Sequence, residues 1–172
     1  MKPNNKKLYN WLIAFVLGIV GLDQLTKILV IRSIPYGAQI PVWPGVVHLT
    51  YVRNAGAAFS MLSGARWLFL VLVAVFFVVL VLLIKKGILS RPAELWCMAA
   101  IAGGALGNAI DRAISGTVVD MIEVEFVRFA VFNVADSFIT CGAIAFIIFT
   151  LFFAKKKETA QQEKEETHED PV

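Results

Sequence analysis

The sequence predicts an all-α membrane protein with four transmembrane helices and a small β-rich platform at its outer face. Three observations lead to this fold class. Of the 172 residues, 58% are hydrophobic and only 17% are charged, whereas soluble domains carry about 25% charged residues. The apolar residues are gathered into four long blocks. The two longest segments between these blocks contain runs of β-branched and aromatic residues, which favour strands.

Each apolar block is long enough to cross the hydrocarbon core as a helix, which takes about 20 residues. The clearest block, residues 67–84, is an unbroken apolar run. The other three hold a few polar residues and cover residues 8–31, 93–111 and 136–154. Lysines precede the first block as they would in a signal peptide. Because no small-residue cleavage site follows it, we expect a retained first span.

Basic residues predict the orientation, because short cytoplasmic segments carry an excess of Lys and Arg. Lysines precede the first span and follow the last, and the tight loop between spans two and three holds two lysines and Arg91. With four spans these segments share one side, so both termini are expected in the cytoplasm. Loops 32–66 and 112–135 then face outward. Their strand-like segments are residues 46–52 and 117–132, the second being a strand or hairpin.

The spans are expected to form one domain over residues 1–154. Residues 155–172 are polar with few apolar side chains, so we expect a disordered cytoplasmic tail. The two cysteines, Cys97 and Cys141, are expected near opposite faces of the bilayer, which is too far apart for a disulfide. Both are expected to be small buried hydrophobic residues.

Charged and amide side chains are costly inside a bilayer and often mark functional sites. Here they come from several segments, and the expected orientation places them all at the outer face or just beneath it. These residues are Asp23, Asn54, Asn108, Asp111, Arg112, Asp120, Asn133 and Asp136. Their one-sided distribution predicts a functional site near the outer leaflet.

Some of these polar residues also have a purely structural interpretation. Asp23 and Lys27 share a helix face, so they could form a self-neutralising pair with Lys27 extended towards the membrane surface. Asn108 is equally consistent with helix packing. Gly103 and Gly107 have the spacing that lets another helix approach closely.

The available residue types narrow the chemistry of this cluster. His48 and His168 are expected on opposite sides of the membrane, so neither a histidine zinc site nor a Ser-His-Asp triad is expected. Neither cysteine has a histidine partner at its depth. Carboxylates remain, and two of them can share a proton and activate water against a carbonyl group. Taken alone, Asp120 also fits a solvated loop residue and Asp136 a helix cap, and the choice among the four aspartates stays open.

Five motifs occur in a fixed order along the chain. They are DQLTK at 23–27, RNAGAAFS at 53–60, GGALGNAIDR at 103–112, VVDMI at 118–122 and FNVADSF at 132–138. Each is weak alone, but the ordered set covers all four spans and is highly specific. In these motifs the sequence resembles the bacterial lipoprotein signal peptidases, the type II signal peptidases.

The resemblance implies an aspartyl endopeptidase of the bacterial inner membrane, without metal or organic cofactor. It implies that the substrates are prolipoproteins with a diacylglyceryl cysteine and that the cut falls on the N-terminal side of that cysteine. Membrane lipids are the other expected partners, and no nucleic acid is expected. The family is also the target of the cyclic peptide globomycin, so inhibition is expected. Asp120 and Asp136 match the catalytic pair. The supporting positions are Asp23, Lys27, Asn54, Gly56, Asn108, Asp111, Arg112 and Asn133.

Two other functions are consistent with part of the pattern of polar residues. A small proton- or cation-handling transporter subunit would use intramembrane carboxylates. Its polar path should continue to the cytoplasm, whereas the inner halves of all four expected spans are nearly free of charge. A structural assembly factor would use the same polar residues only to pin helices together.

Overall fold

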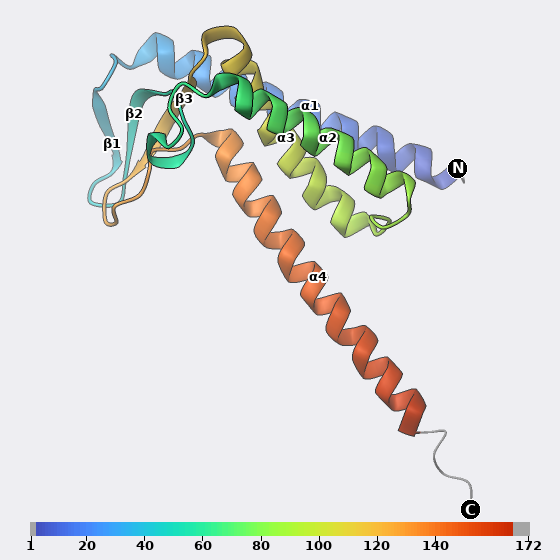
Figure 1. Cartoon of the computed structure of the whole chain (residues 1–172). Helices are drawn as coiled ribbons and strands as arrows, with labels where there is room; N and C mark the ends of the chain where they lie inside the picture. The colour runs from blue at the N-terminus through green and yellow to red at the C-terminus, as the bar shows by residue number, and fades with distance from the viewer. Residues whose placement is uncertain (1–2, 167–172) are drawn as a thin grey trace, which may run out of the picture.

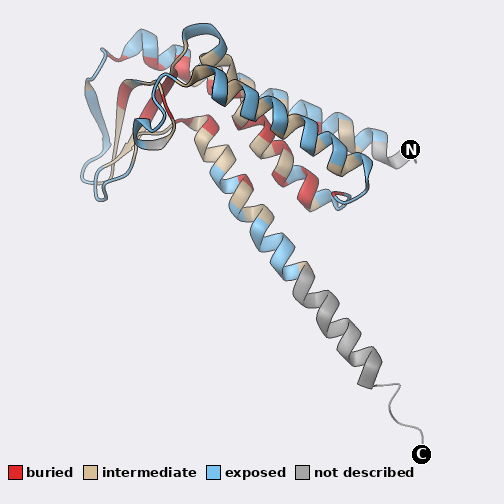
Figure 2. Cartoon of the chain, viewed as in Figure 1, coloured by how far each residue is buried: buried red, intermediate tan, exposed pale blue. Residues whose placement is uncertain are grey.

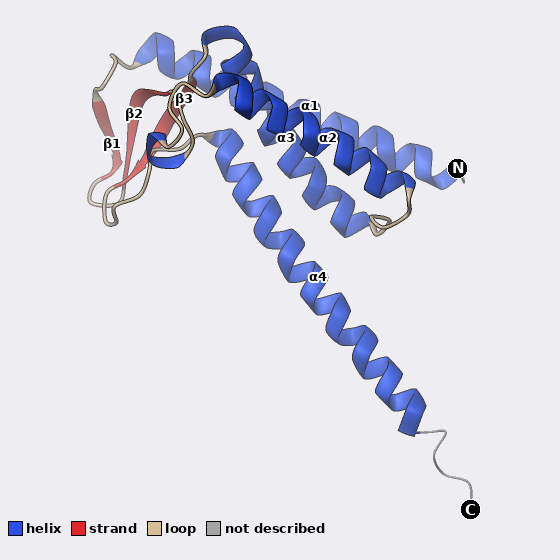
Figure 3. Cartoon of the chain, viewed as in Figure 1, coloured by secondary structure: helices blue, strands red, loops and turns tan. Residues whose placement is uncertain are grey.

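Four long helices and a three-stranded antiparallel sheet make up residues 3–166, which this computed structural model describes (Figures 1 and 3). The elements are α1 (Pro3–Ser33), β1 (Gln39–Trp43), β2 (Val47–Asn54), η1 (Ala58–Ser60), α2 (Arg66–Lys85), α3 (Pro92–Ser115), β3 (Val118–Val124) and α4 (Val134–Glu166). Each α-helix contains a stretch long and apolar enough to cross a membrane. The predicted fold class is therefore confirmed.

Helix α3 is the centre of the helical part and packs against α1, α2 and α4. It carries most of the buried positions of the helices, which Figure 2 shows in red. Glycines permit the close packing: Gly103 lies against Ile19 of α1, and Gly104 lies against the backbone of Ala135 in α4. Gly107 lies against a side chain of α1. The predicted close approach of a helix at Gly103 and Gly107 is confirmed.

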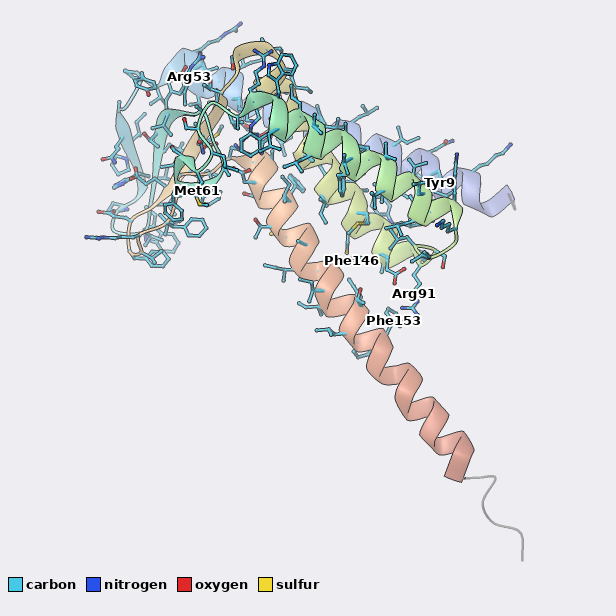
Figure 4. The ribbon with its side chains drawn as sticks, viewed as in Figure 1. Tyr9, Arg53, Met61, Arg91, Phe146 and Phe153 are labelled. Carbon is cyan, nitrogen blue, oxygen red and sulfur yellow. The ribbon has the colours of Figure 1, made fainter. Side chains whose placement is uncertain are left out.

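Helices α2 and α4 lie on two sides of α3; α2 is mostly exposed, and the described part of α4 is a mixture of exposed and half-buried positions (Figure 2). α2 has no buried residue, as expected when the outward face of an apolar helix meets lipid. α4 leaves the other helices at an angle (Figure 1). Far from the sheet, the guanidinium of Arg91 lies over the ring of Phe153, 4.5 Å from its centroid, and links α4 to the start of α3 (Figure 4).

Helix α4 continues to Glu166, past residue 155, from which a disordered tail is predicted. Residues 155–166 are rich in Lys, Glu, Gln and Ala and contain no Gly or Pro. These residue types have high helix propensity, so nothing in the local sequence ends the helix at the membrane boundary. The rest of the predicted tail, 167–172, lies outside the described residues.

The sheet has the strand order β1-β2-β3. β2 and β3 form where strands are predicted, but the second segment is a single strand whose loop returns to pair Phe132 with Ile122. β1 was not predicted as a separate strand. The register between β2 and β3 shifts between Leu49 and Val52, which places Val52 opposite Asp120. The sheet packs on the end of α1 through Val30, Ile34, Tyr51, Val119 and Met121.

Candidate active site

Two aspartates line one cavity where β3 meets the first turn of α4. The cavity has a volume of about 520 Å³, and its walls also include α3 and the segment that follows β2. Asp120 on β3 is only 2% exposed, and Asp136 on α4 is half-buried. The backbone explains how Asp120 reaches this place: α3 ends at Gly116, whose φ of +77° is left-handed and turns the chain into β3.

Two side-chain amides hold the carboxylate of Asp120. Asn133 Nδ2 donates to Oδ1 over 2.6 Å, and Asn54 Nδ2 donates to Oδ2 over 3.1 Å. Burial, and then the negative charge of Asp136, raise the pKa of Asp120 to about 6, although the two amide hydrogen bonds act in the opposite direction. Asp120 can therefore keep or release a proton close to neutral pH.

The start of α4 orients Asp136. Asn133 and Asp136 cap each other: the Asp136 backbone N–H donates to Asn133 Oδ1 over 2.9 Å, and the Asn133 N–H donates to Asp136 Oδ2 over 3.2 Å. This reciprocal arrangement satisfies donors at the helix start. Asn133 is fully buried, and its Nδ2 also donates to Asn108 Oδ1 and to Asp120. One asparagine thus links the two aspartates and the central helix.

A buried lysine lies behind the aspartate pair. Lys27 Nζ is 2.8 Å from Asp23 Oδ2, 2.9 Å from Asp111 Oδ2 and 3.0 Å from Asn108 Oδ1, which uses all three N–H donors of the ammonium group. Asn108 Nδ2 then donates to Asp136 Oδ1 over 2.7 Å. Lys27 is 2% exposed, so its predicted alternative, an extension towards the membrane surface, is wrong.

The two acidic partners of Lys27 also connect the helices with the aspartate pair. Asp23 Oδ1 accepts the backbone N–H of Ala135 over 3.0 Å and so reaches from α1 to α4. Asp111 Oδ2 accepts the N–H of Val119 over 3.2 Å, at the start of β3. These contacts fix the backbone just before each aspartate of the pair.

Arg112 and Asn54 organise the segment that follows β2. Arg112 donates to the carbonyl of Gly56 over 2.7 Å, and its guanidinium lies over the ring of Phe69, 4.5 Å from the centroid. Asn54 Oδ1 accepts the N–H of Gly56 over 2.9 Å. A Cβ at Gly56 would collide with the carbonyl of Met61. Only glycine fits this tight turn at the edge of the cavity.

The structure brings all ten sequence-predicted site residues into one connected region. Sequence reasoning missed Gln24, whose amide donates to Asp111 Oδ1 over 2.9 Å and to the carbonyl of Gly107 over 3.2 Å. Its signal was a polar side chain beside Asp23 in an apolar span. Cys97 is buried as predicted, but the same prediction is wrong for Cys141, which is exposed and lines the cavity.

The arrangement supports acid–base chemistry at a pair of carboxylates. One is nearly enclosed and the other lies at the positive end of a helix, so their environments differ although they share one cavity. Among the described residues, no group of three or more His, Cys, Asp and Glu is placed to hold a metal ion. A carboxylate pair of this kind can activate water and protonate a leaving group.

Comparisons with known proteins agree with this geometry. The family profile described as Signal peptidase (SPase) II matches residues 14–152. A lipoprotein signal peptidase of Brevibacillus brevis is 40% identical over 87% of this chain and 99% of its own length. One from Lactococcus lactis subsp. lactis is 39% identical over 90% of this chain and 99% of its own.

Solved structures give the same result. A bacterial membrane enzyme determined by the in meso method at 2.3 Å resolution superposes with a TM-score of 0.81 at 32% identity, covering 86% of this chain and 92% of that one. A second, at 1.9 Å resolution, gives a TM-score of 0.75 at 33% identity, covering 83% of this chain and 93% of that one. The chain is a multi-pass membrane peptidase and belongs to the signal peptidase II family.

Proposed function

We propose that this protein is an aspartyl endopeptidase of the bacterial cytoplasmic membrane that removes signal peptides from diacylglyceryl-modified prolipoproteins. It cuts on the N-terminal side of the lipidated cysteine. The observation that carries the proposal is the pair Asp120 and Asp136 in one cavity, held by separate amide donors. The name lipoprotein signal peptidase, borne by its relatives, supports the substrate class.

The two aspartates have different roles in this mechanism. Cleavage uses the form of the pair that holds one proton: Asp120, the more enclosed, carries this proton, and Asp136, at the start of α4, acts as the base. Asp136 takes a proton from water as the water oxygen attacks the scissile carbonyl, and Asp120 protonates the carbonyl oxygen. On collapse of the tetrahedral intermediate, Asp136 gives its proton to the leaving amine and Asp120 recovers one from the intermediate.

An apolar groove supports the membrane-embedded part of the substrate. It has a volume of about 370 Å³, lies between α2, α3 and α4, and ends at Asn108, Arg112 and Asp136. Phe69 and Phe76 of α2 contribute to its wall. A signal peptide is an apolar helix, which would lie here beside lipid and present its outer end to Asp136.

The orientation that follows from the basic residues is part of the proposal. Both termini and the loop after α2 lie in the cytoplasm, and the sheet and cavity lie near the outer leaflet. Residues 1–154 then form the peptidase domain and 155–172 a cytoplasmic extension. Accessibility tags at residue 87 and at the C-terminus should be cytoplasmic, and a tag near residue 45 external.

The direct test is cleavage of a diacylglyceryl prolipoprotein by the purified protein in detergent or lipid, with the unmodified precursor alongside. The wild type should cut only the modified precursor and be inhibited by globomycin. Asp120→Asn and Asp136→Asn should each abolish cleavage while insertion is kept. Glu94→Gln, a similar change on α3 outside the cavity, should leave cleavage intact. Robust activity of either asparagine variant would refute the two-aspartate mechanism.

A further inference from the structure

A second cavity lies beside the active-site cavity, and we name it the outer cleft. Its volume is about 400 Å³. Its walls come from β1, β2, the distal end of β3 and the segments that follow β2 and β3. The lining residues used below are His48, Phe59, Glu123, Glu125, Arg128 and Phe129. None of the roles proposed above uses this cleft.

The outer cleft adjoins the active-site cavity. Phe59 and Phe129 line both cavities, so these two rings stand between them. Phe59 has a left-handed backbone with φ of 55°, a rare and strained conformation for a bulky residue that its surroundings must enforce. A chain that leaves the active-site cavity past these rings enters the outer cleft.

Charged side chains of both signs make up a larger share of the lining of the outer cleft than of the active-site cavity, whose walls are mostly apolar. Glu123 Oε2 accepts Gln39 Nε2 over 2.8 Å, and Glu125 Oε2 accepts the N–H of Gly45 over 2.8 Å, with His48 Nε2 3.4 Å away. Among the residues whose side chains the structure describes, none forms a hydrogen bond with Oε1 of either glutamate. Each carboxylate is thus held through one oxygen and offers the other to a ligand.

Resting on the proposed function, we propose that the outer cleft binds the polar segment of the lipoprotein that follows the scissile bond. The substrate changes from apolar to polar across this bond, and the lining changes in the same way from the active-site cavity to the adjoining outer cleft. Only the chain after the bond has to leave the membrane. The part before it is an apolar helix, and the lipid chains belong in the leaflet.

The spacing of residues along a strand predicts which substrate residues lie beside Glu123 and Glu125. Successive residues of a strand are about 3.3 Å apart, so Glu123 in β3 and Glu125, one residue past its end, lie roughly 10 and 16 Å from Asp120 in the strand direction. An extended substrate beside β3 brings its third to fifth residues after the scissile bond to these carboxylates, counting the cysteine as the first. The two glutamates together carry one more charge than Arg128, so basic side chains are preferred over acidic ones at these positions.

The test compares kcat/KM for diacylglyceryl substrates that differ only in residues three to five, carrying Lys, Ser or Glu. The wild type should prefer the Lys over the Glu substrate by about three- to tenfold at low salt, because each part-exposed charge pair contributes up to about fivefold and is screened by ions. Glu123→Gln with Glu125→Gln should bring this ratio close to one and still cut the Ser substrate. Arg128→Glu, on an exposed loop, should increase the ratio.

The matched control is Ser33→Lys, which adds one positive charge at an exposed position outside the cleft and should leave the ratio at its wild-type value. An unchanged ratio in both the glutamine pair and Arg128→Glu overturns the proposal, as does an equal drop in Ser33→Lys. If the glutamine pair does not fold, Arg128→Glu alone decides. Failure of the proposed function is distinguishable, because the wild type would then cut none of the three substrates.

Discussion

Replacing Asp120 by asparagine should stabilise the fold at neutral pH while abolishing cleavage. A carboxyl group whose pKa is raised in the folded state loses stability when it ionises: the penalty is absent below its ordinary pKa of 3.8 and complete above about 6. Two pH units at about 1.4 kcal/mol each correspond to roughly 3 kcal/mol. Asparagine never ionises, so the free energy of unfolding of Asp120→Asn, relative to that of the wild type, should rise by roughly this amount between pH 4 and pH 7.

The assay is the free energy of unfolding in detergent, measured for the wild type and Asp120→Asn at several pH values. The difference between the two proteins removes the pH effects of groups that do not interact with Asp120. Asparagine also loses the hydrogen bond from Asn54, because its Nδ2 cannot accept one, but that cost of about 1 kcal/mol does not depend on pH. Thr50→Val, a buried uncharged control on β2, should show a constant difference. A constant difference for Asp120→Asn as well would refute the assignment of a raised pKa.

Two further substitutions probe the helix packing behind the site. Gly104→Ala should destabilise the fold by about 1–3 kcal/mol and slow cleavage, because the new methyl group collides with the backbone of Ala135. The control Gly18→Ala has nothing near the new methyl group and should be neutral or stabilising. Thermal unfolding of both variants tests this prediction. Lys27→Met should cost about 3–5 kcal/mol because it leaves buried carboxylates uncompensated. Adding Asp111→Asn should restore part of that stability, and an additive loss in the double variant would contradict the ion network.

The helical part of the fold could be predicted because hydropathy is a local property. The apolar run at 67–84 needs no partner to be recognised, and α2 has indeed no buried residue. β1 was missed because its five residues, QIPVW, are short, contain Pro41 and pair only through tertiary contact with β2. The continuation of α4 to Glu166 was not predicted, because a polar composition fits a disordered tail as well as a helix rich in Lys, Glu and Gln.

The composition of the site could be predicted better than its connections. A polar residue in an apolar span is recognisable from the sequence whether or not its partner is known, and Asp23 and Asn108 were predicted in this way. The interpretation of Lys27 required a contact with Asp111, 84 positions later, which helical periodicity cannot supply. For the same reason the sequence did not show that Asn133 forms hydrogen bonds with both Asp120 and Asp136, or that Cys141 lines the cavity.

The pairing of Asp23 with Lys27 within α1 has a consequence for biogenesis. α1 leaves the ribosome before any partner helix exists, so its two charged side chains meet the bilayer alone. At a spacing of four residues and 2.8 Å they neutralise each other inside one helix, which makes α1 an insertable unit. α3 then delivers Asp111 and Asn108 to an ammonium group that is already in the membrane. Correct packing of α3 and α4 on α1 thus adds hydrogen-bond and charge partners to groups that α1 already carries.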